Sequence, residues 1–145
     1  MDFRILKGRD GRGGLVMRLL PGRYRGAASF DEAITVREGA FWFLEHSIHQ
    51  RCADYRKYSH WGLTVIPREE WPAVLADWQE LKIRLQSARL PIDLGVLKSL
   101  PIDHRREFLS DFPRNCRKLV RLIDQLTQWV DQELKTRDEI SLLGI

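Results

Sequence analysis

The chain has 145 residues, of which 43% are apolar and 30% charged, the balance of an ordinary globular protein. At this length it can bury a core of its own, so we expect a single domain over residues 1–145. No apolar run approaches the roughly 20 residues that a membrane helix needs, and the charged, glycine-rich start lacks the apolar stretch of a secretory signal. These features predict a cytoplasmic protein with no membrane partner and with reduced cysteines.

The net charge of +4 is unevenly distributed along the chain. Residues 1–26 hold seven arginines and lysines against two aspartates, so they carry +5 and the remaining 119 residues sum to −1. A basic segment of this kind can contact phosphate or an acidic protein. A solvated, loop-rich edge is the simpler interpretation.

The first part of the chain predicts short strands. Apolar residues at 2–7 and 15–20, separated by a glycine-rich loop, predict a hairpin over residues 3–20. Pro21-Gly22 ends this hairpin as a turn, and residues 27–30 have strand character.

The next segment allows two interpretations. Thr35 and Glu38 form a capping-box pattern for a helix that starts near Val36. The alternative is a hairpin with strands at 34–37 and 40–44. The helix is favoured because apolar residues recur at helical spacing well beyond residue 44, at Phe41, Leu44, Ile48, Cys52 and Tyr55. The pattern alone does not decide between helix and hairpin at 34–44.

The clearest pattern is a strand–helix unit at residues 61–85. The strand, 61–66, is rich in β-branched and aromatic residues and is stopped by Pro67. The helix carries a stripe roughly 140° wide, formed by Trp71, Val74, Leu75, Trp78, Leu81, Leu85 and Ala88. We expect Trp71 and Trp78 to lie in the core and the rest of the chain to pack around them.

The second half of the chain predicts helices and a short terminal strand. Prolines and a glycine mark residues 89–102 as a long connection. A helix with Asp103 as its N-cap is expected at 103–112, and a longer one at about 113–135. The apolar tail, 140–145, is expected to pair as an edge strand or to dock on the core. Together the elements predict an α+β fold, a small antiparallel sheet packed against three to four helices.

Metal binding and catalysis find little support in the residue pattern. His46, His49 and Cys52 have a spacing of three, and imidazole with thiolate suits zinc, but these positions drift around a helix and Cys52 belongs to its apolar stripe. The glycines match no phosphate loop, and the four histidines lie in no known catalytic motif. We therefore expect no enzyme activity, no cofactor and no metal.

Two groups of residues are candidates for partner binding. Arg114, Arg117, Lys118 and Arg121 fall on one side of the last long helix, roughly 135° from its apolar face. A solvated face is the simpler interpretation of this stripe, and a stripe that follows phosphates would make the chain a small basic nucleic-acid-binding protein. Trp42 and Trp61 lie near polar, turn-like chain where a partner can reach them.

The strand–helix unit resembles small immunity proteins of bacterial polymorphic-toxin and contact-dependent growth inhibition systems. The resemblance covers an aromatic-glycine pair, an Ile-Pro stop and an acidic helix start, which are Trp61-Gly62, Ile66-Pro67 and Glu69-Glu70-Trp71. It implies a non-catalytic inhibitor that binds the toxic C-terminal domain of a cognate effector. It carries over no contact residues, because the shared residues are mostly structural.

One feature departs from the usual pattern of such inhibitors. Inhibitors of nucleases are commonly acidic, whereas this chain is basic. The resemblance therefore implies either a toxin that is not a typical basic nuclease or a contact through a local acidic patch. Charge complementarity would then speed association with an acidic toxin surface.

Overall fold

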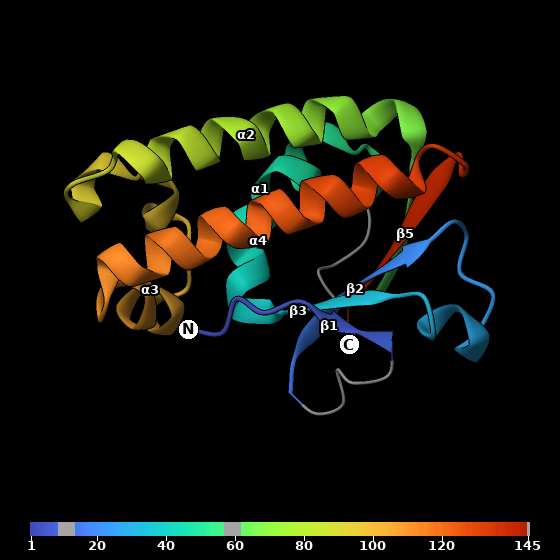
Figure 1. The fold of residues 1–145 in the computed structure, drawn as a ribbon, viewed down its shortest axis with the longest axis horizontal. Helices are drawn as coiled ribbons and strands as arrows, with labels where there is room; N and C mark the ends of the chain where they lie inside the picture. Colours follow the sequence, from blue (N-terminus) through green and yellow to red (C-terminus); the bar gives the residue numbers. More distant parts are fainter. Residues whose placement is uncertain (9–13, 57–61, 145) are drawn as a thin grey trace.

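Five strands form one antiparallel sheet in the computed structural model, which describes residues 1–8, 14–56 and 62–144 (Figure 1). The strands are β1 (Leu6–Lys7), β2 (Val16–Pro21), β3 (Ile34–Arg37), β4 (Gly62–Pro67) and β5 (Glu139–Gly144). Their order across the sheet is β1-β3-β2-β5-β4, so the C-terminal strand lies between β2 and β4.

Four α-helices occur in the same described ranges: α1 (Glu38–Arg51), α2 (Trp71–Ser87), α3 (Ile102–Leu109) and α4 (Phe112–Glu133). Short 3₁₀ turns lie at Ala27–Phe30, Asp54–Arg56, Arg68–Glu70, Pro91–Asp93 and Gly95–Lys98. Helices α2 and α4 run antiparallel and in contact, and α3 lies at the end of the molecule where α2 finishes and α4 begins (Figure 1). The predicted α+β fold is confirmed.

The core lies between one face of the sheet and the helices. The cross-strand register places Met17, Leu19, Ile34, Ile140 and Leu142 on the same face of the sheet, and each is at most 3% exposed. These side chains form one apolar cluster with the buried residues of all four described helices. Removal of this surface from water is the main driving force for the fold.

The two tryptophans of α2 are fully buried, which confirms the expectation from the sequence. Their ring centroids lie 6.0 Å apart with an edge-on angle of 74°. The Nε1–H of Trp78 donates a hydrogen bond of 3.1 Å to the backbone carbonyl of Leu44, which joins α2 to α1. The Nε1 of Trp71 is buried without a hydrogen-bond partner among the described residues.

The predicted hairpin over residues 3–20 is wrong. Strand β1 pairs with β3, and β3 lies between β1 and β2. All six residues of β2 are buried, so the backbone N–H and C=O groups of this strand need hydrogen-bond partners on both sides. The strands β3 and β5 supply these partners along the length of β2, which the two-residue β1 could not do. Residues 27–30 form a 3₁₀ turn and not a strand.

Neither interpretation of residues 34–44 is complete. Ile34 to Arg37 is a strand, as the hairpin alternative proposed, and a helix follows from Glu38, as the helical period predicted. Thr35 does not cap that helix, because it pairs with Arg18 in the sheet and its hydroxyl is buried. The backbone N–H of Glu38 instead donates to the carbonyl of Leu15 at 3.1 Å.

The predicted long helix at 113–135 is confirmed within two residues. The helix before it begins one residue earlier than predicted, with Pro101 rather than Asp103 at the N-cap, and ends at Leu109. The tail pairs as a strand, but it is an interior strand and not an edge strand. No helix in the described ranges combines the length and the apolar character needed to cross a bilayer.

The contrast between the two tryptophans gives a stability prediction. Trp71→Phe and Trp78→Phe remove similar volume from the same core, but only the second also removes a buried hydrogen bond. We expect Trp78→Phe to lower the free energy of unfolding by about 1 kcal/mol more than Trp71→Phe. Urea denaturation of both variants measures this difference, and equal losses would contradict it.

Candidate functional site

The four basic residues predicted on one side of the last helix do share one face of α4. Arg114, Arg117 and Arg121 are exposed, and Lys118 is half-buried. The opposite face of α4 is fully buried at Leu119, Leu122, Ile123, Leu126 and Val130. We call the four basic residues the α4 basic row.

The row has little internal charge compensation. Arg114 lies 3.9 Å from Asp111 on the exposed surface, and no carboxylate among the described residues pairs with the other three members. Other arginines are closely paired. Arg51, for example, donates two hydrogen bonds of 2.9 Å to Asp77, and Arg137 pairs with two glutamates.

The position of the row is unfavourable for the helix that carries it. Arg114 falls in the first turn of α4, where the positive end of the helix dipole disfavours cations. Arg114 with Arg117 and Lys118, and Arg117 with Arg121, are like-charge pairs three or four residues apart, which destabilise a helix. A row that weakens its own helix, and in which only Arg114 has a carboxylate partner among the described residues, is consistent with use in binding.

A groove of about 410 Å³ runs beside the row, between the end of α2 and the start of α4. Its lining combines apolar and cationic groups, and includes Leu85, Ala88, Cys116, Val120, Arg117 and Arg121. Burial raises the pKa of the Cys116 thiol to about 11, so the thiol stays protonated at neutral pH. The groove therefore offers apolar surface with positive charge at its rim.

Exposed apolar side chains gather at the same end of the molecule. Leu90 is 61% exposed and Ile92 is 84% exposed in the segment that leaves α2, and Ile102 and Leu109 of α3 are 60% and 39% exposed. This segment and α3 lie together at one end in Figure 1. The sequence analysis did not single these residues out. A charge count over residues 85–121, with eight arginines and lysines against four acids, would have shown a local excess of +4 here.

The structure describes one of the two other predicted contact residues. Trp42 lies on α1, half-buried and packed against the core. Trp61 lies outside the described residues. Nothing in the fold tests a role in partner binding for either tryptophan, so both stay predictions.

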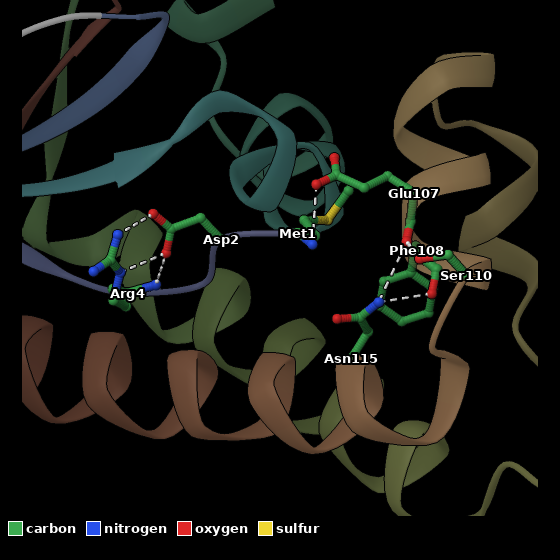
Figure 2. A network of polar contacts seen from close by, with 7 residues as sticks. All are labelled: Met1, Asp2, Arg4, Glu107, Phe108, Ser110 and Asn115. Carbon is green, nitrogen blue, oxygen red and sulfur yellow. Dashed lines mark hydrogen bonds and ion pairs between the residues drawn. The ribbon is translucent and has the colours of Figure 1, made fainter.

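The predicted basic N-terminal segment does not form a common surface in the part that the structure describes. Asp2 accepts both Nε and NH2 hydrogen bonds from Arg4, and this contact lowers the pKa of Asp2 to about 2 (Figure 2). Arg18 is buried with its guanidinium 4.6 Å from the centre of the Phe30 ring. Arg23 pairs with Glu139 at 3.0 Å. These cations act mostly within the fold.

Polar contacts fix the corner between α3 and α4, where the basic row begins. The side-chain amide of Asn115 donates 2.9 Å to the carbonyl of Phe108 and 3.4 Å to that of Glu107, which satisfies carbonyls at the end of α3 (Figure 2). The amino group of Met1 pairs with the Glu107 carboxylate at 3.0 Å. These contacts join the start of α4 to α3 and the N-terminus at the place where the row begins.

The zinc candidate residues are dispersed over different surroundings. His46 lines a cleft of about 310 Å³ between α1 and α2, His49 lies edge-on to the ring of Tyr55, and burial raises the pKa of the Cys52 thiol, with a hydrogen bond to Glu70 adding to the shift. Within residues 1–8, 14–56 and 62–144, no three histidine, cysteine or acidic side chains lie close enough to hold a metal.

A buried polar pair was missed by the sequence analysis. The hydroxyl of Tyr55 donates a 2.5 Å hydrogen bond to Oε1 of Glu45, and both side chains are at most 7% exposed. Burial raises the pKa of Tyr55, and the contact with Glu45 adds to the shift. The sequence did offer a signal for this pair, because Glu45 is a charged residue among the apolar residues Phe43, Leu44 and Ile48 of the same helix. The pair anchors the chain just before β4 and has a structural role.

Known proteins offer no comparison for this surface. No protein-family model, no curated protein and no solved structure matches the chain.

The unfavourable position of the row predicts a stabilising substitution. Arg117→Glu replaces like-charge pairs with attractive ones toward Arg114 and Arg121, so we expect it to raise the free energy of unfolding by roughly 0.5–1 kcal/mol. Urea denaturation measures the change. Arg25→Glu, at an exposed arginine outside the row, is the matched control and should change stability little. A loss of stability in Arg117→Glu would show that the row is compensated.

Proposed function

We propose that the chain is a non-catalytic protein-binding module, an immunity protein that binds and neutralises a cognate bacterial toxin domain in the cytoplasm. The observation that carries this proposal is the α4 basic row, which has little charge compensation among the described residues and borders a groove with apolar lining. An apolar centre with arginines around it is the composition typical of protein–protein contacts.

The charge of the surface suits rapid inhibition. A neutraliser must bind its toxin before damage accumulates, and complementary charges speed the encounter of two proteins. The proposed toxin contact is therefore acidic, which agrees with the first of the two alternatives for a basic inhibitor.

The resemblance at residues 61–85 supports the scaffold more than the contact surface. Ile66 and Trp71, two of its features, are buried in the core and cannot touch a partner. The step from protein binding to toxin neutralisation rests on this resemblance alone.

A nucleic-acid-binding protein is the second candidate. The first and last exposed arginines of the row, Arg114 and Arg121, are seven positions apart on the helix, or about 10 Å, enough to meet neighbouring phosphates. The exposed apolar side chains at the same end favour a protein partner, since they contribute nothing to phosphate binding.

A capture experiment followed by a growth assay tests the proposal. The tagged chain is recovered from nuclease-treated lysate of its native host, and the domain found with it is expressed alone and together with the chain. We expect the domain to stop growth alone and the chain to restore it. Arg117→Glu/Arg121→Glu should lose this protection, whereas the control Arg25→Glu/Lys7→Glu, with the same change of charge on exposed residues elsewhere, should keep it.

Two results would contradict the proposal. One is capture of no domain that stops growth. The other is recovery of nucleic acid when the nuclease is omitted, with binding that falls steeply as salt rises and weakens in the same arginine variants, which would establish the second candidate.

A further inference from the structure

The distribution of exposed apolar side chains singles out one end of the molecule. Leu15, just before β2, Leu63 on β4 and Ile83 on α2 are exposed singly, which is ordinary for a protein surface. The remaining large exposed apolar residues of the described ranges fall within residues 90–109, and they are Leu90, Ile92, Ile102 and Leu109. Exposed apolar side chains gathered in this way mark a contact surface.

This cluster adjoins the groove between α2 and α4. Ala88, in the groove lining, precedes Leu90 by two residues, and Pro113, on the opposite wall, follows Leu109 by four. The groove and the exposed residues together form what we call the apolar end. Its groove of about 410 Å³ lies between the antiparallel helices α2 and α4, and this volume can accept side chains that protrude from a partner.

The charges of the apolar end are positive and unbalanced. The four acidic residues between positions 85 and 121 already have partners within the molecule. Asp93 accepts hydrogen bonds from the backbone of residues 89 and 90, and the other three, Asp103, Glu107 and Asp111, lie near cations of the same molecule. Arg117 and Arg121, at the groove itself, have no carboxylate partner among the described residues.

We propose that the apolar end is the docking surface of the chain, and that its occupant is an acidic amphipathic helix of the toxin domain. This assignment rests on the proposed function. The apolar ridge of the helix fills the groove between α2 and α4 and covers Leu90 and Ile92, and its flanking carboxylates face Arg117 and Arg121. A helix that inserts one face into an apolar groove is a common mode of protein recognition.

The same features argue against two other occupants. A second copy of this chain would bring its own Arg117 and Arg121 toward an equally cationic surface, which like-charge repulsion disfavours. An anionic lipid surface would suit the charge, but it is flat and offers no ridge to fill the groove.

A synthetic probe tests the surface without a known toxin. The probe is a peptide of about five helical turns with a leucine ridge and flanking glutamates, and its control has lysines in place of the glutamates. Backbone NMR spectra of the full chain are recorded with each peptide. We expect the acidic peptide to shift resonances of residues 85–92 and 113–121, and the basic peptide to leave them unchanged.

Variants of the chain complete the test. Ile92→Asp should weaken binding of the acidic peptide by about tenfold or more, because it removes apolar surface from the contact. Ile92 is 84% exposed, so we expect this variant to keep its fold. The control is Leu15→Asp, at a residue that is 55% exposed just before β2, and this variant should bind the peptide normally. No shift with the acidic peptide, or shifts outside the apolar end, would overturn the proposal.

Further outcomes separate this inference from the proposed function. Binding to phosphatidylserine vesicles that Ile92→Asp abolishes, without binding of the acidic peptide, would assign the surface to a membrane. Concentration-dependent dimerisation that Ile92→Asp abolishes would assign it to self-association. Growth protection that survives Ile92→Asp would keep the immunity function and remove the docking surface from it. Binding of the acidic peptide without growth protection in any toxin assay would keep the docking surface and contradict the immunity function.

Discussion

The insertion of β5 between β2 and β4 is the constraint on which the rest of the structure depends. It pairs the last strand with β2 from the start of the chain and with β4 from its middle, through unbroken antiparallel registers. Helix α4 leads directly into β5, so this pairing also sets the direction of α4 across the core (Figure 1). Once the apolar face of α4 is buried against α2 and the sheet, its basic row must point outward. The proposed contact surface thus follows from the closure of the sheet.

The apolar end combines two features that each lower stability. The basic row weakens the first turns of α4 by like-charge repulsion, and the leucines and isoleucines nearby leave apolar surface in water. Elsewhere in the described ranges Arg51 is paired with Asp77, and the two tryptophans of α2 are fully buried. Natural sequences tolerate local violations of this kind where a partner relieves them. An acidic helix with an apolar ridge would relieve both at once, which is the physical reason for choosing it over nucleic acid.

Patterns local in sequence predicted the parts of this fold that depend on local periodicity. Strand β4 follows from its β-branched composition and its proline stop, and the stripe of α2 and the two faces of α4 follow from the spacing of apolar and charged residues. Strand pairing did not follow, because the neighbours of β2 come from residues 34–37 and 139–144, far apart in sequence. Thr35 misled the prediction of a helix start, since a capping pattern is worth little when the residue is needed inside a sheet. The groove could not be foreseen, because it exists only where α2 and α4 meet.

Site-specific photo-crosslinking in living cells of the native host tests the central claim most directly. A photoreactive amino acid is placed at position 92 in the apolar end, or at position 15 just before β2, both exposed in the free chain. The account predicts that irradiation joins position 92, and not position 15, to one protein whose linked peptide is an acidic amphipathic helix from a toxic domain. Crosslinks from position 15 alone, or linkage of position 92 to nucleic acid or lipid, would contradict it.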